Sequence, residues 1–290
     1  FDYNYYCQKK YYWFSVSPRK ESDKWVKNNR KFLSLEWKVL KKRIIPVQLL
    51  LNNRLVKTTK FDEYRDVGDP VSSSRVYNSQ YADELIFLNI DKNATGIEPL
   101  EEILESVSEV CFMPLAVGGG IRNYKDAATL IKRGADKVVL NTICYDNPQI
   151  ISEIANNFGN QAVIVAIDVK KNPEGYSLYS SCGQTIESVL LEEHCNNCIN
   201  AGAGEILIQS IDQDGSMQGF DLELMRYIKN IVNIPIIALG GAGNYLHLRD
   251  VFLKSNVSAV ACGSLFNFSD SNLIRAKAFL SNYNLDFKVV

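Results

Sequence analysis

The sequence predicts an α/β protein: a closed (β/α)8 barrel of the TIM type, built from two similar halves. Eight apolar runs of strand length alternate with segments of helical spacing from residue 43 onward, which is the pattern of a parallel barrel. The chain also repeats itself, because Met113 and Ile234 begin two similar stretches that lie 121 positions apart. Asp91 and Asp212 are separated by the same interval. A doubly wound open sheet is the alternative, because a strand count from sequence can be wrong by one or two.

Each predicted strand is a short, nearly continuous apolar run, as expected for parallel strands buried on both faces. The strands are expected at residues 43–51, 84–90, 113–118, 136–141, 162–169, 204–210, 235–240 and 258–263. The segments between them have the spacing of amphipathic helices. Helices are expected at residues 98–109, 123–134, 148–158, 187–201, 221–231 and 244–254.

Residues 1–38 differ from the remainder and are interpreted as an N-terminal extension of unknown role, which leaves residues 39–290 for the barrel. The extension interleaves Tyr, Phe and Trp with Lys and Arg and has no clean periodicity. Such a mixture can stack on nucleic acid, but no recognisable nucleic-acid-binding module is present. The chain starts at Phe1 rather than Met, which favours an upstream translated extension or a fragment boundary.

The composition is that of an ordinary soluble globular protein. The 290 residues are 46% hydrophobic and 22% charged, with a net charge of −1, so no electrostatic argument favours nucleic acid or an anionic membrane as a partner. No apolar run reaches the length of a membrane span, and no secretory signal pattern is present at the start. Seven cysteines, an odd number mostly within apolar runs, indicate reduced thiols and a cytoplasmic enzyme.

One cysteine pair resembles half of a metal-binding knuckle, in the sequence His194-Cys195-Asn196-Asn197-Cys198. A structural zinc site needs four ligands, and the chain has no second CxxC and no HxxxH. We therefore expect the pair to lie on a helix without a metal, and we predict neither a metal nor a cofactor.

A glycine-rich turn follows a strand directly in each half of the chain. The two stretches are MPLAVGGGIRNYKDAATLIKRGADKVVLNT (113–142) and IPIIALGGAGNYLHLRDVFLKSNVSAVACGS (234–264). Glycines there let backbone N–H groups approach an anion, and the following helix N-terminus favours negative charge. Small or polar residues end the next strand in each half: Asn141, Thr142, Gly263 and Ser264. The pattern predicts two phosphate sites at one barrel mouth; the alternative is a pair of tight turns without a ligand.

Two further segments place carboxylates where parallel strands end. In VIVAID the apolar run leads into Asp168, and catalytic groups of barrel enzymes lie at the C-terminal ends of strands. Asp168 is thus a candidate catalytic group, although it could also simply cap the next loop. Asp214 and Gly215 follow the strand at 204–210 and could reach a ligand, or form a tight loop only. The position equivalent to Asp168 in the first half holds Leu49, which cannot transfer a proton.

Four charged residues stand at or near the N-terminal starts of strands: Arg43, Glu84, Lys137 and Glu205. Charges at the bottom of an apolar barrel are costly unless they are paired. A ring of alternating Arg, Glu, Lys and Glu can satisfy itself and could form a polar gate. The alternative is four separate, solvent-exposed charges.

From Val39 to about the end, the chain resembles the cyclase subunit of imidazole glycerol phosphate synthase, a histidine-biosynthesis lyase. The motifs RIIP, GDP, DELIFL, VGGGI, GADKVVLNT, VAID, GAGEIL, SIDQDG, PIIALGGAG and GSLF occur in the order of that family. The resemblance implies a (β/α)8 barrel that receives ammonia from a glutaminase docked at its bottom. Ammonia would pass a gate and cross the core to a bisphosphate ligand at the top.

The resemblance assigns roles to individual residues of this sequence. The gate falls on Arg43, Glu84, Lys137 and Glu205, a docking-face aspartate on Asp136, and the lysine of a mobile first loop on Lys57. One of the two catalytic aspartates is Asp168, whereas the other is replaced by Leu49, and Asn89 stands where an aspartate is usual. The residues assigned to phosphate or substrate binding are Lys57, Gly120, Asn141, Thr142, Asp214, Gly215, Gly241, Gly263 and Ser264.

The replacement at Leu49 leaves the residues assigned to ammonia delivery in place and removes one of the two acid–base groups. A positioned acid or base contributes roughly 10²- to 10⁴-fold to a rate. This combination looks like the paralogue of the cyclase subunit found with acetamidino modification of surface sugars. There the pair would supply ammonia to a third, ATP-using sugar amidotransferase. The alternatives are a genuine cyclase subunit of histidine biosynthesis and a non-catalytic, phosphate-binding activator of the glutaminase.

Overall fold

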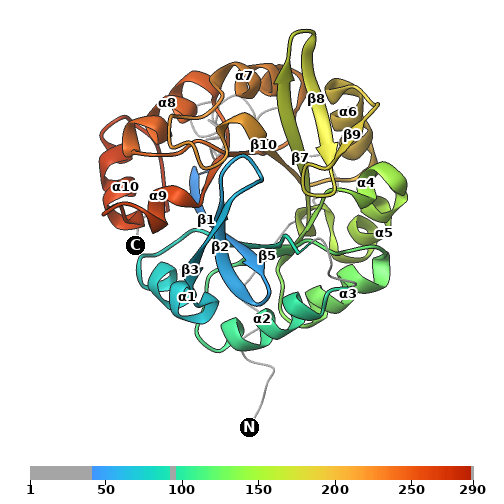
Figure 1. The fold of residues 1–290 in the computed structure, drawn as a ribbon, viewed down its shortest axis with the longest axis horizontal. Helices are drawn as coiled ribbons and strands as arrows, with labels where there is room; N and C mark the ends of the chain where they lie inside the picture. Colours follow the sequence, from blue (N-terminus) through green and yellow to red (C-terminus); the bar gives the residue numbers. More distant parts are fainter. Residues whose placement is uncertain (1–40, 92–95, 289–290) are drawn as a thin grey trace, which may run out of the picture. The chain divides into compact units, whose positions relative to one another are not determined.

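A computed structural model describes residues 41–91 and 96–288, which form a closed eight-stranded parallel barrel (Figure 1). Each barrel strand pairs in parallel with the next, and β10 pairs with β7 to complete the closed cycle. The (β/α)8 barrel is confirmed, and the open sheet is excluded. The barrel strands are β1 (Arg43–Leu51), β4 (Leu85–Asn89), β5 (Leu115–Gly118), β6 (Lys137–Leu140), β7 (Val163–Asn172), β10 (Glu205–Ser210), β11 (Ile236–Leu239) and β12 (Ala259–Cys262).

The extension predicted at residues 1–38 lies outside the described residues. Within them, no helix is long and apolar enough to cross a membrane.

An outer layer of helices covers the barrel. Its longer members are α1 (Pro70–Ser79), α2 (Glu98–Ser108), α3 (Tyr124–Lys132), α5 (Gln149–Phe158), α6 (Leu191–Ala201), α7 (Leu222–Ile231), α8 (Tyr245–Ser255) and α10 (Leu273–Ser281). Several begin at a side chain that accepts a hydrogen bond from a first-turn N–H; Asp221 does so for α7 and Asn244 for α8. Sequence spacing missed α1, because Ser74 occupies a buried position where an apolar residue would have marked the inner face.

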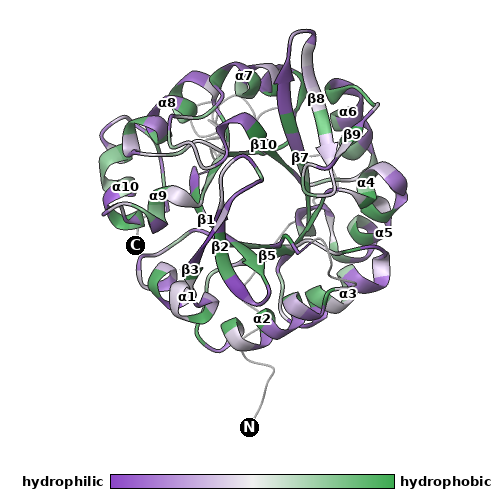
Figure 2. Cartoon of the chain, in the orientation of Figure 1, coloured by the Kyte–Doolittle hydropathy of each residue, from purple (hydrophilic) through white to green (hydrophobic). Residues whose placement is uncertain are grey.

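Side chains of each barrel strand alternate between two apolar layers, as the two-residue period of a strand requires. On β1, Ile45 and Val47 point into the barrel, whereas Ile44 and Leu50 pack against the helices. Figure 2 shows the barrel strands mostly green, with hydrophilic residues on the outer edges of the helices. The inward positions define the axis of the molecule, so charged or polar residues at either end of that axis are the candidates for chemistry.

The two halves are built alike. An antiparallel hairpin follows the first strand of each: β2 (Arg54–Thr58) and β3 (Tyr64–Gly68) after β1, and β8 (Gly175–Ser180) and β9 (Thr185–Glu187) after β7. A four-residue helix follows the last strand of each, α4 (Ile143–Asp146) and α9 (Ser264–Asn267). The resemblance placed Lys57 on the first loop; the connection from β1 to α1 is the β2–β3 hairpin, and Lys57 lies on β2, paired with β3.

Candidate functional site

The four predicted gate residues meet at the N-terminal end of the barrel and form one ion-pair network, called here the charged ring (Arg43, Glu84, Lys137 and Glu205). The Arg43 guanidinium donates to Glu84 Oε1 at 2.5 Å and to Glu205 Oε2 at 2.5 Å. Lys137 Nζ lies 2.8 Å from Glu84 Oε1 and 2.5 Å from Glu205 Oε1. Each cation therefore bridges both carboxylates, and separate solvent-exposed charges are excluded.

The charged ring is largely shielded from water, so its charges depend on one another. Burial opposes ionisation of Glu205, but the charges and hydrogen bonds of Arg43 and Lys137 outweigh it and lower the pKa of that carboxyl. Burial likewise opposes the charge on Arg43, and the two carboxylates outweigh it and raise the pKa of the guanidinium. One oxygen, Glu84 Oε2, is buried without a hydrogen-bond partner. The network closes the barrel floor with alternating charge.

Asp136 lies just outside the charged ring, immediately before β6. Its Oδ2 accepts a hydrogen bond from the backbone N–H of Leu115 at 3.0 Å, and the residue is exposed. The carboxylate thus ties β6 to β5 and still faces outward from the barrel floor.

At the opposite end of the axis, Asp168 ends the inward-facing row of β7, after Ile164 and Ala166. Its carboxylate is buried, and Asn141 Nδ2 donates to Oδ2 at 2.8 Å. Burial raises the pKa of Asp168 to about 7, against the opposing effect of the Asn141 hydrogen bond. A carboxyl group with such a pKa exchanges protons near neutral pH, which suits a general acid or base.

Leu49 ends the inward-facing row of β1, after Ile45 and Val47, at the same level of the barrel mouth. It pairs in register with Leu88 of β4, and both side chains pack on the inner apolar layer. The end of β1 therefore presents a hydrocarbon side chain to the barrel mouth. Asn89, the other unusual position, points outward from β4; its Oδ1 accepts from the Asp91 N–H, and its Nδ2 is buried without a partner.

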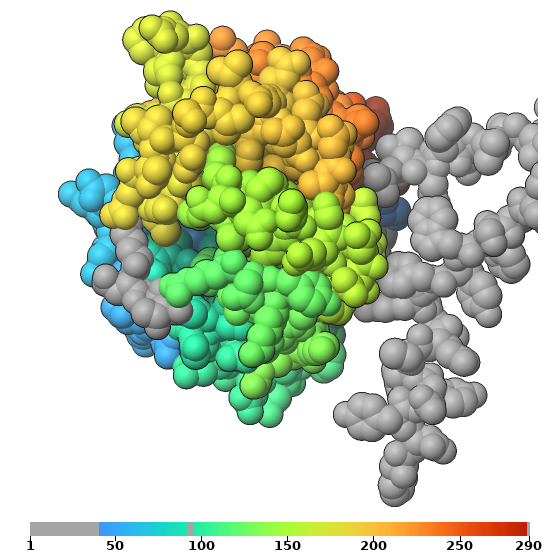
Figure 3. All heavy atoms as spheres, turned by 90° about the vertical axis from the view of Figure 1, so that its right-hand side faces the viewer, coloured from blue at the N-terminus to red at the C-terminus, as the bar shows by residue number. Residues whose placement is uncertain are grey.

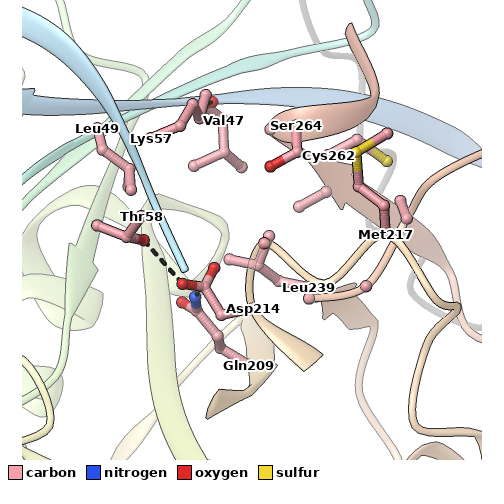
Figure 4. Close-up of a pocket in the computed structure, with 16 residues that line it drawn as sticks. Val47, Leu49, Lys57, Thr58, Gln209, Asp214, Met217, Leu239, Cys262 and Ser264 are labelled. Carbon is pink, nitrogen blue, oxygen red and sulfur yellow. Dashed lines mark hydrogen bonds between the residues drawn. The ribbon is translucent and has the colours of Figure 1, made fainter. Parts of the chain in front are cut away.

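A pocket at the mouth joins the end of β1 to the second half of the barrel (Figure 4). Lys57 reaches into it from β2, and its Nζ donates to the backbone carbonyl of Val47. Burial lowers the pKa of Lys57 to about 8, although Asp214 opposes the shift. Leu49, Leu239 and Met217 add apolar walls. The predicted phosphate-binding residues that line this pocket are Lys57, Asp214, Gly215, Gly241, Gly263 and Ser264.

Asp214 fastens the β2–β3 hairpin over the mouth. Its Oδ2 accepts from Thr58 Oγ1 at 2.7 Å and from the Phe61 N–H at 3.2 Å, and the first of these bonds is drawn in Figure 4. Burial raises the pKa of Asp214, against these hydrogen bonds and the charge of Lys57. Gly215 allows the close approach, because a Cβ there would lie 2.3 Å from the Thr58 carbonyl oxygen. The Asp214 carboxylate therefore contacts the hairpin.

The two glycine-rich turns that were predicted to bind anions have the positive φ angles that glycine permits. Gly120 and Gly241 have φ angles of 80° and 99°, values that side chains other than glycine rarely adopt. A Cβ at Gly241 would lie 1.9 Å from the Gly219 carbonyl oxygen, so only glycine fits. Gly263 leaves room for the Lys57 ammonium, since a Cβ there would lie 2.8 Å from Nζ.

The first-half residues Gly120, Asn141 and Thr142 do not line the pocket of Figure 4. Asn141 instead holds Asp168, and Thr142 Oγ1 accepts from the Ser181 N–H at 3.0 Å. Sequence reasoning missed Gln209, an inward-facing residue beside Asp168 whose Nε2 lies 3.4 Å from Asp214 Oδ1. Gln209 could have been identified from the sequence, because, like Asp168, it stands near the end of an apolar strand run.

The His194-Cys195-Cys198 segment lies on α6, as expected. Within the part of the chain that the structure describes, no group of three or more His, Cys, Asp or Glu side chains is arranged to hold a metal ion.

The structure thus defines a class of protein: a (β/α)8 barrel with a repeated half, a closed ring of charges at its floor and a glycine-lined pocket at its mouth. The sequence profile of the family described as histidine biosynthesis protein matches residues 43–272. The chain belongs to that family, and within it to the group of the cyclase subunit of imidazole glycerol phosphate synthase.

Two relatives named "Imidazole glycerol phosphate synthase subunit HisF" support this assignment over nearly their whole length. The Staphylococcus carnosus (strain TM300) protein is 37% identical over 252 residues, which cover 86% of this chain and 99% of the relative. The Alkaliphilus metalliredigens (strain QYMF) protein is 38% identical over 251 residues, which cover 86% of this chain and 100% of the relative.

Proposed function

We propose that this chain is the barrel subunit of a glutamine-dependent complex that supplies ammonia for acetamidino modification of a surface-polysaccharide sugar. The observation on which the proposal rests is Leu49. A leucine faces the mouth at the position equivalent to Asp168, so one of two proton-transfer groups expected of a cyclase is absent. A positioned acid or base contributes roughly 10²- to 10⁴-fold to a rate, and this chain would lose at least that much cyclase activity.

The proposed route for ammonia starts at the charged ring. A glutaminase subunit would dock on the barrel floor, where Asp136 faces outward, and release ammonia beside Lys137 and Glu84. Above the charged ring the inner layer is apolar and includes small side chains: Ala116, Ala166, Ala259 and Ala261. Neutral ammonia can enter such a layer, whereas an ammonium ion would lose its hydration without gaining a counter-charge. The ring therefore suits a gate that passes the neutral species.

At the mouth, a phosphorylated small molecule would occupy the pocket beneath the β2–β3 hairpin. The Lys57 ammonium, the Gly241 turn and the Ser264 N-terminus of α9 supply the donors, and Gly120 with Thr142 would contribute on the opposite side. The acceptor of ammonia would lie on a third, ATP-using sugar amidotransferase. Asp168 would keep a residual or regulatory role.

Two alternatives follow from other observations. Asp168 is retained with a pKa of about 7, which favours a genuine cyclase subunit of histidine biosynthesis that works with one aspartate. An intact charged ring beside an incomplete mouth also suits a non-catalytic, phosphate-binding activator of the glutaminase. That activator would stimulate glutaminase activity and yield no product with any amidation partner.

Complementation separates the proposal from the first alternative. The chain is expressed in a histidine auxotroph that lacks its own cyclase subunit, together with the matched Leu49→Asp variant. We expect no growth without histidine from the natural chain, because Leu49 cannot move a proton. Growth at the normal rate would refute the proposal and establish a cyclase.

The charged ring is tested by comparing two nitrogen sources. Lys137→Ala should alter transfer of glutamine-derived ammonia to the acceptor and leave transfer from free ammonium salt unchanged. Lys277→Ala is the matched control, since Lys277 Nζ pairs with Asp83 Oδ1 at 2.7 Å outside the ring. An equal response to both nitrogen sources would mean that ammonia does not pass through the ring.

A further inference from the structure

A second pocket lies on the flank of the barrel, away from both ends of the axis. Its walls come from α4, α5, α6 and the segment after β9, on the face turned toward the viewer in Figure 3, where α4 and α5 are lime and α6 is yellow. About 930 Å³ of space, part of it open solvent, lies between these walls. The residues that line it include Cys144, Tyr145, His194 and Cys198, and both cysteine side chains are buried.

Two thiols meet at the base of this pocket. The Cys144 and Cys198 side chains are hydrogen-bonded to each other, although they come from different halves of the chain. Cys198 Sγ also lies 3.6 Å from His194 Nε2, one helical turn earlier on α6. The His194 ring stacks on Tyr145, with centroids 4.1 Å apart and planes 7° from parallel. The imidazole is thus held beside the Cys198 sulfur.

The environment makes the two sulfurs chemically unequal. The hydrogen bond from Cys144 and the neighbouring His194 lower the pKa of Cys198, against the effect of burial. The same hydrogen bond, reinforced by burial, raises the pKa of Cys144. Cys198 is therefore the more readily ionised of the two thiols. An activated thiolate next to a second thiol is the arrangement of a peroxidatic and a resolving cysteine.

We propose that Cys198 and Cys144 form a redox-sensitive pair that hydrogen peroxide converts to a disulfide. The Cys198 thiolate attacks one peroxide oxygen, the O–O bond breaks, and hydroxide leaves, which gives a sulfenic acid. The Cys144 sulfur then attacks the Cys198 sulfur and displaces water. In total two thiols lose two electrons and two protons, and one peroxide becomes two waters.

The disulfide would act on the barrel mouth through α4. Closing from a hydrogen-bond contact to an S–S bond of about 2.05 Å draws the first turn of α4 toward α6. The Cys144 N–H donates to the Asn141 carbonyl at 2.8 Å, and Asn141 Nδ2 donates to Asp168 at 2.8 Å. Oxidation at the flank would therefore displace the residue that holds the retained carboxylate. This inference does not depend on the proposed function.

The test uses the full chain, treated with hydrogen peroxide at pH 7, then unfolded in urea, alkylated with N-ethylmaleimide and digested for mass spectrometry. We expect a peptide pair linked through Cys144 and Cys198, two fewer alkylated thiols, and reversal by dithiothreitol. Cys195→Ser is the matched control, because Cys195 lies on the same helix with its pKa raised by burial to about 12; this variant should still form the link. Cys198→Ser should abolish it. Persistent alkylation of Cys144 and Cys198 while the more exposed Cys182 is oxidised would refute the proposal.

Two further measurements test the role of His194 and the effect on the mouth. His194→Gln should slow formation of the link at pH 7 by about tenfold or more, since the thiolate fraction falls when its partner is removed; an unchanged rate would show that His194 does not activate Cys198. Amide hydrogen exchange over residues 141–147 should increase on oxidation and recover with dithiothreitol. Unchanged exchange in a fully linked sample would overturn the connection to Asp168.

Discussion

Replacing Asp168 by asparagine should stabilise the protein at alkaline pH, and the gain should disappear in acid. The carboxyl is buried, and its only hydrogen-bond donor among the described side chains is Asn141. Asparagine has nearly the same shape, keeps an oxygen to accept that bond, and carries no charge. The variant thus removes the cost of burying a charge and leaves the packing of the mouth in place.

The magnitude follows from the pKa. The ordinary value of 3.8 rises to about 7 in the fold. The folded state therefore holds a proton that the unfolded chain releases between these two pH values, and the free energy of unfolding falls as the pH rises through this window. Each pH unit is equivalent to about 1.4 kcal/mol, so ionised Asp168 costs on the order of 4 kcal/mol above pH 7.

Urea unfolding of the wild type and Asp168→Asn is measured in parallel from pH 4 to 8. The difference between the two proteins gives the contribution of Asp168 ionisation to the free energy of unfolding, because other titrating groups affect both proteins equally. The difference in unfolding free energy should be near zero at pH 4, grow up to neutrality and then level off. A difference that does not vary with pH would refute the reasoning. So would a variant that is less stable than the wild type at pH 8, because either result means that the carboxylate is well solvated.

Three other substitutions test the scaffold by urea unfolding. Lys137→Met leaves two buried carboxylates facing one guanidinium and should lower the free energy of unfolding by about 3–5 kcal/mol. This loss should be smaller when Glu84→Gln is also present. Additive losses from the two substitutions would contradict the ion-pair network. Gly241→Ala should lower the free energy of unfolding more than Gly134→Ala does, by at least about 1–3 kcal/mol. Both glycines have a positive φ, but only a Cβ at Gly241 would clash with a carbonyl oxygen. Equal losses of stability would show that the turn at Gly241 adapts. Asp221→Ala should cost about 1 kcal/mol through the lost cap of α7, and no loss would mean that solvent replaces it.

The barrel could be predicted from sequence because each wall strand is buried on both faces and must be apolar throughout. The predicted strands contain all eight observed ones, apart from the last three residues of β7, which extend the hairpin that β7 forms with β8. The hairpins themselves were not predicted. The β3 sequence YRDVG and the β8 sequence GYSLYS lie outside the barrel wall, so no continuous apolar run marks them.

The sequence predicted the floor of the barrel better than its mouth. The charged ring was predictable because a strand start fixes both the height and the direction of Arg43 and Glu205 in the barrel. The mouth was predictable only in part, because loops determine which residues meet there. Asp214 lines the mouth pocket, but its carboxylate also holds the β2–β3 hairpin, and Asn141 holds Asp168. Spacing along a chain does not reveal such contacts.

The charged ring also bears on how the duplicated halves recognise each other. A cut between α5 and β7 would leave Arg43, Glu84 and Lys137 on one fragment and Glu205 on the other. The ring would then carry a net positive charge on the first fragment and a negative charge on the second, at the same level of the exposed barrel interior. Complementary fragments would pair through opposite charges, whereas two copies of either fragment would repel. Fragment complementation would thus favour the correct hetero-pair over either homo-pair.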